Sequence, residues 1–416
     1  MAYGIQIMLK WGARGGEESM DIDILCKVVD NYGDIGVAYR LARSLSETPE
    51  PPRLRLVVDE LLAFAALDPA VDPASACQRV HGWEVFSWKE GGAESAAGEA
   101  IRAAFKERRP RCLIECFACG RPEWLEAILF DPVSEEGCLV LDLEHLTAEA
   151  YAEDFHRMPS LTRSPLVRKA MFLPGFTPRT GGLVMDRAFA ISLERARSEE
   201  GRRGLRRELL ARLAEPGSPA AGAEASFWFA VFSYERDYGR VVAELSAFVG
   251  DSPILALVAA GKSQDCFRRA WEAASAPFPA LFLPFLPQTD WDAFLAAADF
   301  AIVRGEDSWS RAALAGRPFL WQAYPQEGRH HMVKVEAFLD RLRPHFRPEA
   351  FATLAELYRA FNGRDRDAPE AAGGEALLPV LRRRDELRDG FASFAASLAR
   401  GPDLGPALLT FLGDLV

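Results

Sequence analysis

The chain has 416 residues, of which 49% are hydrophobic and 26% are charged, and its formal net charge is −11. This composition is typical of a soluble globular protein, and the acidic balance argues against nucleic-acid binding, which needs a basic surface. The length exceeds that of one ordinary hydrophobic core, so two domains are expected. Seven cysteines, an odd number, favour a reducing cytoplasm over a disulfide framework. The sequence has no apolar run near the roughly 20 residues of a membrane span.

The first patterned stretch is an apolar run at residues 22–29, which predicts a buried parallel strand. A polar turn and an amphipathic helix follow it. The turn contains two carboxylates, Asp30 and Asp34, and two glycines, Gly33 and Gly36, which allow close approach of the backbone to a ligand. Because ligands gather at the carboxyl ends of parallel strands, this turn is the first candidate site.

Strand and helix patterns alternate after this unit. Further strands are predicted at residues 53–58, 112–118 and 138–143, and helices at residues 61–67, 101–107 and 122–129. Such alternation produces a parallel sheet with helices on both faces. Cys112, Cys116 and Cys119 lie in or next to one of these strands, and no second CxxC or HxxxH follows them at zinc spacing. We therefore interpret them as buried structural thiols and expect no metal site.

A second series of the same kind begins at residue 227. Its strands are predicted at residues 227–232, 254–259, 281–286, 300–303 and 319–324, and its helices at residues 238–249, 265–274, 291–298, 308–315 and 326–342. A charged segment and a Pro- and Gly-rich segment precede it. The arginines of the charged segment alternate with acids, which favours a solvated helix face; they are Arg202, Arg203, Arg206 and Arg207.

These patterns predict an α/β protein with two Rossmann-like domains that face each other across a cleft, which is the plan of the GT-B glycosyltransferases. The expected boundaries are an extension outside the folded core at residues 1–20, an N-terminal domain at 21–185, a charged helix and linker at 186–225, and a C-terminal domain at 226–380. Helices of about residues 381–416 are expected to cross back and complete the N-terminal domain.

The second candidate site is the run Arg304-Gly305-Glu306-Asp307-Ser308, which joins a strand to a helix. A helix N-terminus with free N–H groups and a preceding arginine is suited to bind a diphosphate. The structural alternative makes Asp307 or Ser308 an N-cap, with Glu306 stabilising the positive end of the helix. The pattern alone leaves both possibilities open.

The third candidate is a pair of aromatic residues, Phe232 and Tyr234, at the end of the first strand of the second series. Residues at alternate positions of a strand point to the same side, so the two rings can act together. Core packing is the alternative interpretation. Aromatic faces also stack well on nucleotide bases.

Three blocks in this order resemble the bacterial protein-arginine rhamnosyltransferases that modify elongation factor P, the EarP family. They are the Asp-Asn-Tyr-Gly-Asp-Ile-Gly turn after the first strand, the Phe-Ser-Tyr-Glu segment at 232–235, and the block around Arg304-Gly305-Glu306-Asp307-Ser308. Gln288 matches a further nucleotide contact of the family. The chain departs from the family pattern at four positions; these are Ser233 for cysteine, Arg236 for asparagine, Trp309 for phenylalanine and Gln322 for histidine.

The resemblance implies an inverting, metal-independent enzyme that moves L-rhamnose from dTDP-β-L-rhamnose to an arginine of elongation factor P in the cytoplasm. No cofactor, nucleic acid or membrane partner is implied. By the same resemblance Asp34 is the general base, Asp30 positions the acceptor arginine and Glu306 is needed for activity. The implied donor contacts are Phe232, Tyr234, Gln288, Arg304, Asp307 and Ser308, with Gly305 allowing close backbone approach.

Two other functions fit the same patterns. One is a GT-B transferase for another nucleotide sugar or acceptor, such as a lipid-linked glycan. The other is a non-catalytic protein that docks on a translation factor. Transfer or hydrolysis of dTDP-rhamnose distinguishes them from the implied activity.

Overall fold

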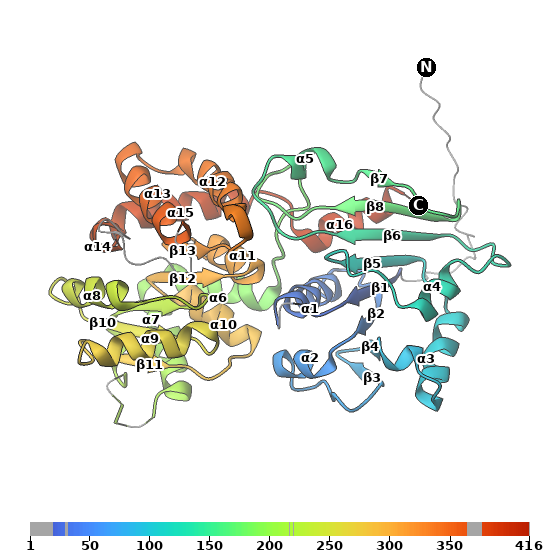
Figure 1. Cartoon of the computed structure of the whole chain (residues 1–416), viewed down its shortest axis with the longest axis horizontal. Helices are drawn as coiled ribbons and strands as arrows, with labels where there is room; N and C mark the ends of the chain where they lie inside the picture. Colours follow the sequence, from blue (N-terminus) through green and yellow to red (C-terminus); the bar gives the residue numbers. More distant parts are fainter. Residues whose placement is uncertain (1–19, 30–31, 216, 219, 364–376, 416) are drawn as a thin grey trace, which may run out of the picture. The chain divides into compact units, whose positions relative to one another are not determined.

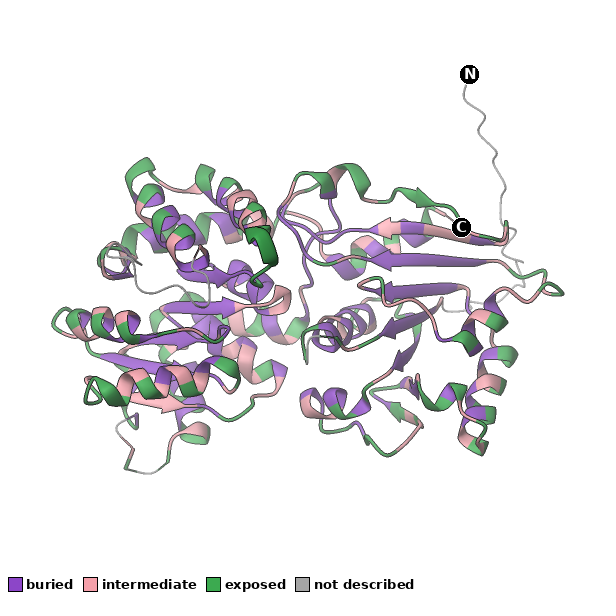
Figure 2. Cartoon of the chain, viewed as in Figure 1, coloured by how far each residue is buried: buried purple, intermediate pink, exposed green. Residues whose placement is uncertain are grey.

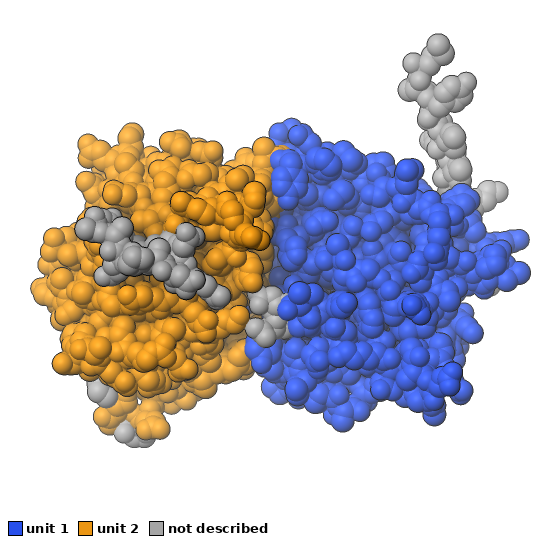
Figure 3. Space-filling model, viewed as in Figure 1, with its two compact units in different colours: residues 1–146, 151–186, 402–416 blue, residues 147–150, 187–401 orange. Residues whose placement is uncertain are grey.

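The structure, a computed structural model, describes residues 20–29, 32–215, 217–218, 220–363 and 377–415 (Figure 1). It consists of two compact units, which Figure 3 colours separately. Unit 1 contains the described residues up to 146, residues 151–186 and the tail from 402; unit 2 contains residues 147–150 and 187–401. The predicted extension lies outside the described residues except for Met20, whose carbonyl accepts a hydrogen bond from the Arg53 amide at 2.7 Å.

Unit 1 is built on an eight-stranded sheet in the order β3-β4-β2-β1-β5-β6-β8-β7. Its strands are β1 (Asp21–Cys26), β2 (Arg53–Val58), β3 (Cys77–Val80), β4 (Trp83–Ser87), β5 (Cys112–Cys116), β6 (Cys138–Leu143), β7 (Pro159–Ser160) and β8 (Val167–Phe172). The inner strands pair in parallel, and β3 and β7 add antiparallel edges. The sequence analysis did not predict β3, β4, β7 or β8, which are short or interrupted by polar residues.

Helices cover both faces of this sheet. They are α1 (Gly33–Ser46), α2 (Leu61–Leu67), α3 (Ala96–Glu107), α4 (Glu123–Leu129), α5 (Tyr151–Phe155) and α16 (Leu404–Gly413). One core lies under α1, α2 and α16, and a second core lies under α3 and α4. The buried strands and the outward-facing exposed helix surfaces are visible in Figure 2. Both cores follow from the apolar side chains that alternate across β1 and its neighbours.

The first strand ends at Cys26, three residues earlier than predicted. Two carboxylates explain the early end. The Val28 amide donates to Asp59 Oδ1 at 2.8 Å, and the Val29 amide donates to Asp34 Oδ2 at 2.8 Å. Backbone amides that are bonded to side chains cannot continue the ladder, so the chain turns here.

Unit 2 is built on a five-stranded parallel sheet in the order β11-β10-β9-β12-β13. Its strands are β9 (Phe227–Val231), β10 (Ile254–Val258), β11 (Ala280–Phe282), β12 (Phe300–Arg304) and β13 (Phe319–Gln322). Its longer helices are α6 (Arg187–Arg197), α7 (Glu199–Leu213), α8 (Gly239–Phe248), α9 (Lys262–Ala273), α10 (Gln288–Ala297), α11 (Glu306–Ala315), α12 (His331–Leu342), α13 (Pro348–Asn362), α14 (Leu377–Arg382) and α15 (Arg384–Leu398).

The predicted domain boundaries need two corrections. Helices α6 and α7, expected within a linker, belong to unit 2 and pack against α10, because Leu205, Leu209 and Leu210 are buried. Of the tail, α16 belongs to unit 1, whereas α15 belongs to unit 2, where Phe391 contacts Phe319 with ring centroids 5.0 Å apart. A run of charges at the start of α15 hid this apolar face in the sequence.

The arginine run on α7 was interpreted as a solvated helix face, and this interpretation is wrong for Arg206. Only 2% of this residue is exposed. Its guanidinium donates to the carbonyls of Ala297 and Ser226 and to Asp299, at 2.6–3.0 Å. Arg207, the next residue, is exposed. A charge in the interior is tolerated when its donors are bonded, and this arginine ties α7 to the edge of the sheet.

Candidate active site

Both sheets contain the Rossmann strand order, in which the order reverses next to the first strand of the series. In unit 1 this switch point lies between β1 and β5, and in unit 2 it lies between β9 and β12. Ligands of open α/β sheets bind outside the carboxyl ends of the strands at such a point. Asp34 follows β1, Phe232 and Tyr234 follow β9, and Arg304 ends β12. These four residues therefore lie at the carboxyl ends of the strands of their sheets.

In unit 1 the candidate residue is Asp34, the second residue of α1. Its side chain is buried, with 8% of the residue exposed, and its Oδ2 atom accepts the hydrogen bond from Val29. The residue before the helix is Tyr32, and among the described residues no side chain caps this helix start. Asp34 therefore holds the turn together without serving as the N-cap.

The other residues of this turn are only partly described. Asp30 lies outside the described residues. A Cβ atom on Gly33 meets nothing within 4 Å, so the surface beside it is open. Gly36 is buried and its amide donates to the Tyr32 carbonyl at 2.9 Å. Gly33 thus leaves room beside the backbone, whereas Gly36 belongs to the first helical turn.

In unit 2 the guanidinium of Arg304 lies between two aromatic rings. Its central carbon is 4.7 Å from the ring centroid of Phe232 and 4.8 Å from that of Tyr234. Tyr234 is buried, with 2% exposed, while Phe232 and Arg304 are half-buried. Two cation–π contacts hold the arginine at the carboxyl edge of the sheet and leave part of its surface accessible.

Helix α11 begins next to this arginine, at Glu306. Its N-cap is Gly305, whose φ of +68° disfavours any residue with a side chain. Among the described residues no side chain caps this helix start, so the alternative that Asp307 or Ser308 is the N-cap is wrong. Glu306 and Asp307 are half-buried in the first turn. The first amides of α11 form a positive end beside Arg304.

Two contacts link this helix start to the aromatic pair, through a residue that the sequence analysis did not single out. The indole Nε1 of Trp291 donates to Ser308 Oγ at 3.1 Å. The Trp291 ring also packs edge-on against Phe232, with centroids 5.2 Å apart. Trp291 lies in the first turns of α10, which also starts with the buried Gln288. Its position after β11 could have suggested a role at the same edge.

Gln322 is the second residue that the motifs alone did not assign. It ends β13, and its Oε1 atom accepts a hydrogen bond from the Tyr234 amide at 2.9 Å. The Tyr234 ring packs edge-on against Tyr324, with centroids 5.3 Å apart. Gln322 thus fixes the backbone from which Tyr234 projects. The histidine that the resemblance predicts at this position could offer a ring nitrogen to the same amide.

The other three family departures lie behind the site. Trp309 has 1% of its surface exposed and stacks on Trp321 with centroids 3.8 Å apart and planes 6° apart. Ser233 is buried and its amide donates to Ser263 Oγ at 3.2 Å. The guanidinium of Arg236 donates to the Phe361 carbonyl at 3.1 Å and lies 3.4 Å from that ring centroid. These three residues pack behind the candidate site and support the backbone around it.

A buried charge pair anchors α11 from below. Arg311 and Asp292 have 0% and 1% of their side chains exposed, and Arg311 Nε lies 3.9 Å from Asp292 Oδ1. The Arg311 guanidinium also lies 4.6 Å from the ring centroid of Phe189. Because these contacts connect α11 to α10 and α6, the helix start is held in place before any ligand binds.

Metal ligation was not expected from the sequence, and within the described ranges no group of three or more His, Cys, Asp or Glu side chains is placed to hold a metal ion. The prediction of buried thiols is confirmed for Cys112 and Cys116, whereas Cys119 is only half-buried. Cys112 and Cys116 are buried, and burial raises the pKa of both thiols. Burial, followed by the charge of Glu115, also raises the pKa of Cys119 to about 12. These thiols are therefore neutral at physiological pH.

Comparison with known proteins places this architecture in a class. Similar solved structures include a glycosyltransferase from Rickettsia africae, with a TM-score of 0.50, 9% identity, and coverage of 95% of this chain and 98% of that one. At this identity the likeness concerns the fold alone. Two Rossmann-like units of this kind make up the GT-B fold.

The sequence comparisons are more specific. Residues 22–413 match the family model described as elongation factor P (EF-P) rhamnosyltransferase EarP. A protein-arginine rhamnosyltransferase of Pseudomonas putida is 34% identical, over 94% of this chain and 97% of its own length. The corresponding protein of Shewanella oneidensis is 32% identical, over 88% and 92%. The chain belongs to the EarP family of protein-arginine rhamnosyltransferases.

A solved structure that concerns EarP-mediated arginine glycosylation of translation elongation factor EF-P agrees with this assignment. It has a TM-score of 0.54 and 25% identity, and covers 95% of this chain and 99% of that chain. Each helix in the described part of the chain is too short or too polar to pass through a lipid bilayer.

Proposed function

We propose that this enzyme transfers L-rhamnose from dTDP-β-L-rhamnose to an arginine side chain of elongation factor P, with inversion at the sugar and without a metal ion. The observation that carries the proposal is the position of Arg304, between the rings of Phe232 and Tyr234 and beside the N-terminus of α11. Aromatic faces, a cation and a helix N-terminus in one place are what a nucleoside diphosphate needs.

On the donor side, the diphosphate gains negative charge as the bond to the sugar breaks. Arg304 and the amides of α11 stabilise that charge electrostatically, at an edge where the helix start is already fixed. Glu306 is itself an anion and cannot do so; orienting the sugar is the role that its chemistry allows. Asp307 and Ser308 supply further polar contacts in the same turn, and Gln288 supplies an amide from the start of α10.

On the acceptor side, the arginine side chain is a protonated guanidinium and therefore a poor nucleophile. A carboxylate must accept a proton as the nitrogen attacks. We assign this role to Asp34, whose Oδ2 atom is bonded to the Val29 amide, so that the carboxylate is held in one orientation. We assign capture of the guanidinium to Asp30.

The transfer is a single displacement. A guanidinium nitrogen bonds to C1 of rhamnose on the face opposite the diphosphate, the C1–O bond to the diphosphate breaks, and dTDP leaves with the bonding electron pair. The proton lost by the nitrogen goes to Asp34 and from there to solvent. Attack opposite the leaving group converts the β-linked donor into an α-linked product, so inversion follows from one displacement.

The acceptor identity rests on the relatives. They are named protein-arginine rhamnosyltransferases, and the similar solved structure concerns EF-P. Because the proposed acceptor is a translation factor, we place the reaction in the cytoplasm. The proposal needs no metal because Arg304 and the α11 amides supply positive charge where a metal ion would otherwise be needed.

The decisive experiment is incubation of the enzyme with dTDP-β-L-rhamnose and elongation factor P from the same organism, followed by mass spectrometry of the factor. We expect one added deoxyhexose on an arginine and an α-anomeric signal by NMR. A factor with that arginine changed to lysine is the matched acceptor control. Transfer from UDP-N-acetylglucosamine but not from dTDP-rhamnose, or a β-linked product, would contradict the proposal.

A further inference from the structure

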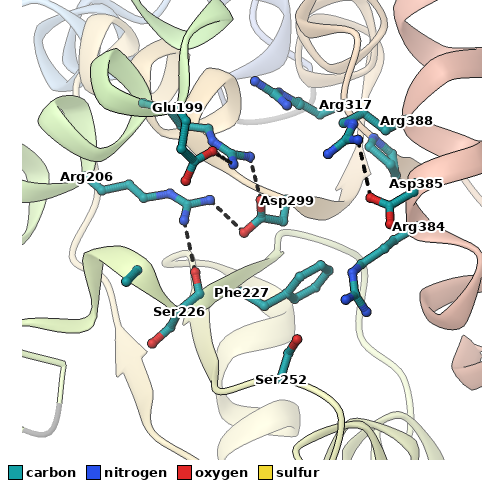
Figure 4. A pocket seen from close by; sticks show the side chains of 13 residues that line it. Glu199, Arg206, Ser226, Phe227, Ser252, Asp299, Arg317, Arg384, Asp385 and Arg388 are labelled. Carbon is teal, nitrogen blue, oxygen red and sulfur yellow. Dashed lines mark hydrogen bonds and ion pairs between the residues drawn. The ribbon is translucent and has the colours of Figure 1, made fainter.

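Unit 2 has a second charged site, at the amino ends of the strands of its sheet; Arg304 lies at the carboxyl ends. A pocket of about 200 Å³ lies where the strands β9, β12 and β13 begin (Figure 4). We call it the arginine pocket; it is lined by Glu199, Arg202, Arg206, Ala225, Ser226, Phe227, Ser252, Asp299, Arg317, Pro318, Arg384, Asp385 and Arg388. The proposed donor site lies at the carboxyl ends of the strands, so the two sites are separate.

Positive charge is in excess in the arginine pocket. Five arginines face three carboxylates, a formal surplus of two positive charges. The acids on one side are already engaged, since Asp299 pairs with Arg202 and Arg206, both at 2.6 Å. Among the described residues, neither Arg317 nor Arg384 has a carboxylate within ion-pair distance. The surplus is therefore concentrated on the side formed by the β13 edge and α15.

The cations reach the pocket from three separate elements. Arg202 and Arg206 come from α7, Arg317 precedes β13, and Arg384 and Arg388 come from α15. Guanidinium groups that converge from several directions match an anion whose oxygens point several ways, such as phosphate, better than a planar carboxylate. The volume also lies below the roughly 300–1,000 Å³ of pockets for drug-sized ligands, which favours a small ion.

Arg317 shows the effect of this surplus positive charge most directly. Its guanidinium donates to the Ala196 carbonyl at 2.6 Å, which fixes it in the wall. Burial, followed by the positive charge of Arg202, lowers the pKa of Arg317 to about 10. The group still carries its charge at neutral pH, in surroundings that disfavour it. A bound anion relieves this repulsion.

We propose that the arginine pocket binds a free tetrahedral oxyanion of the size of inorganic phosphate, and that binding stabilises unit 2. The anion connects α15 to the edge of the sheet and to α7, three elements that otherwise bring like charges together. This role is independent of sugar transfer, because it uses the opposite edge of the sheet. Ligands that bind only the folded state raise its stability in proportion to the logarithm of their concentration.

The probe is inorganic phosphate, added at millimolar concentration to the whole chain at constant ionic strength, with chloride as the reference anion. Melting temperature and equilibrium dialysis of radioactive phosphate report binding. All measurements are made with Arg304→Ala, which removes the arginine of the proposed donor site and so separates the two possible phosphate sites. We expect a saturable rise in melting temperature and one bound phosphate per chain.

Variants on α15 give effects of opposite sign. Arg388 and Asp385 are both exposed side chains of α15, paired at 3.3 Å, so changing either should spare the fold. Arg388→Gln should weaken phosphate binding about tenfold, the scale of one lost charged hydrogen bond. Asp385→Asn should instead tighten it severalfold. Arg269→Gln, an exposed arginine of α9, is the matched control and should change nothing.

Three results would overturn the proposal. One is the lack of a saturable response to phosphate in the Arg304→Ala chain. The second is an equal response in Arg388→Gln and Arg269→Gln, which would indicate a general salt effect. The third is a loss of affinity in Asp385→Asn. None of these results depends on rhamnosyl transfer, so failure here leaves the proposed function untouched.

Discussion

Replacing Asp34 by asparagine keeps the size of the side chain and removes its charge. The proposed base is then lost, and a general base typically contributes roughly 10²–10⁴-fold in rate. The structural cost is much smaller. The amide oxygen of asparagine can still accept the hydrogen bond from the Val29 amide. Val29 is 84% exposed, so water can also replace this bond. We expect a loss of about 1 kcal/mol in the free energy of unfolding, or about 2–4 °C in melting temperature.

The two effects are separated by measuring transfer in single turnover with saturating donor and acceptor, beside a thermal melt. Donor affinity should not change, because the proposed donor contacts belong to unit 2. Asp59→Asn is the matched control: Asp59 Oδ1 accepts from the Val28 amide in the same turn, at the same 2.8 Å. We expect the control to melt lower and to transfer at nearly the wild-type rate. If Asp34→Asn behaves like this control, the carboxylate is structural and the assignment of the base is wrong.

Three other predictions follow from the contacts. Arg304→Ala should weaken dTDP binding by ~1–3 kcal/mol in calorimetry, and unchanged affinity would place the diphosphate elsewhere. Arg206→Ala should destabilise unit 2 by about 3–5 kcal/mol, since it leaves buried partners unpaired, whereas Arg207→Ala should stay within about 0.5 kcal/mol in chemical denaturation; equal losses would refute the distinction. Burial, followed by the charge of Arg157, lowers the pKa of His156 to about 4. The unfolded chain then binds more protons than the folded chain between about pH 6.5 and pH 4. The free energy of unfolding should therefore decrease as the pH is lowered through that window, by roughly 1 kcal/mol after allowance for partial exposure. A His156→Gln variant should lack this part of the pH dependence, and an identical profile would exclude the histidine as its source.

Much of the fold could be predicted because the apolar runs of parallel strands are continuous and Gly, Pro and charged residues separate them. The predicted bounds of β2 and β6 are those of the structure. The edge strands β3 and β7 were missed because an edge strand need bury only part of its surface. The early end of β1 depends on hydrogen bonds to Asp34 and Asp59, and a sequence pattern does not contain such tertiary contacts.

The candidate site, like the fold, could be predicted only in part from the sequence. The motifs and the resemblance located Arg304 and Tyr234, and the structure brings them within 4.8 Å. Trp291 of α10 contacts Ser308 and Phe232, and Gln322 of β13 binds the Tyr234 amide; only the packing of the sheet reveals this support. The burial of Arg206 was hidden for a related reason: a long side chain on a charged helix has the same local pattern whether it points to solvent or into the protein.

The stack of Trp309 on Trp321 couples amino-acid substitutions at these two positions. Residue 309 is expected to be phenylalanine in the family, and a smaller ring here would leave a void against Trp321 and Phe338, which also touches Trp309. Packed neighbours of this kind typically show interaction energies of roughly 0.5–3 kcal/mol in double-mutant cycles. A lineage that changes residue 309 therefore comes under selection to refill the space at residue 321. Substitutions at residues 309 and 321 should therefore be correlated with each other, independently of changes at the proposed donor contacts.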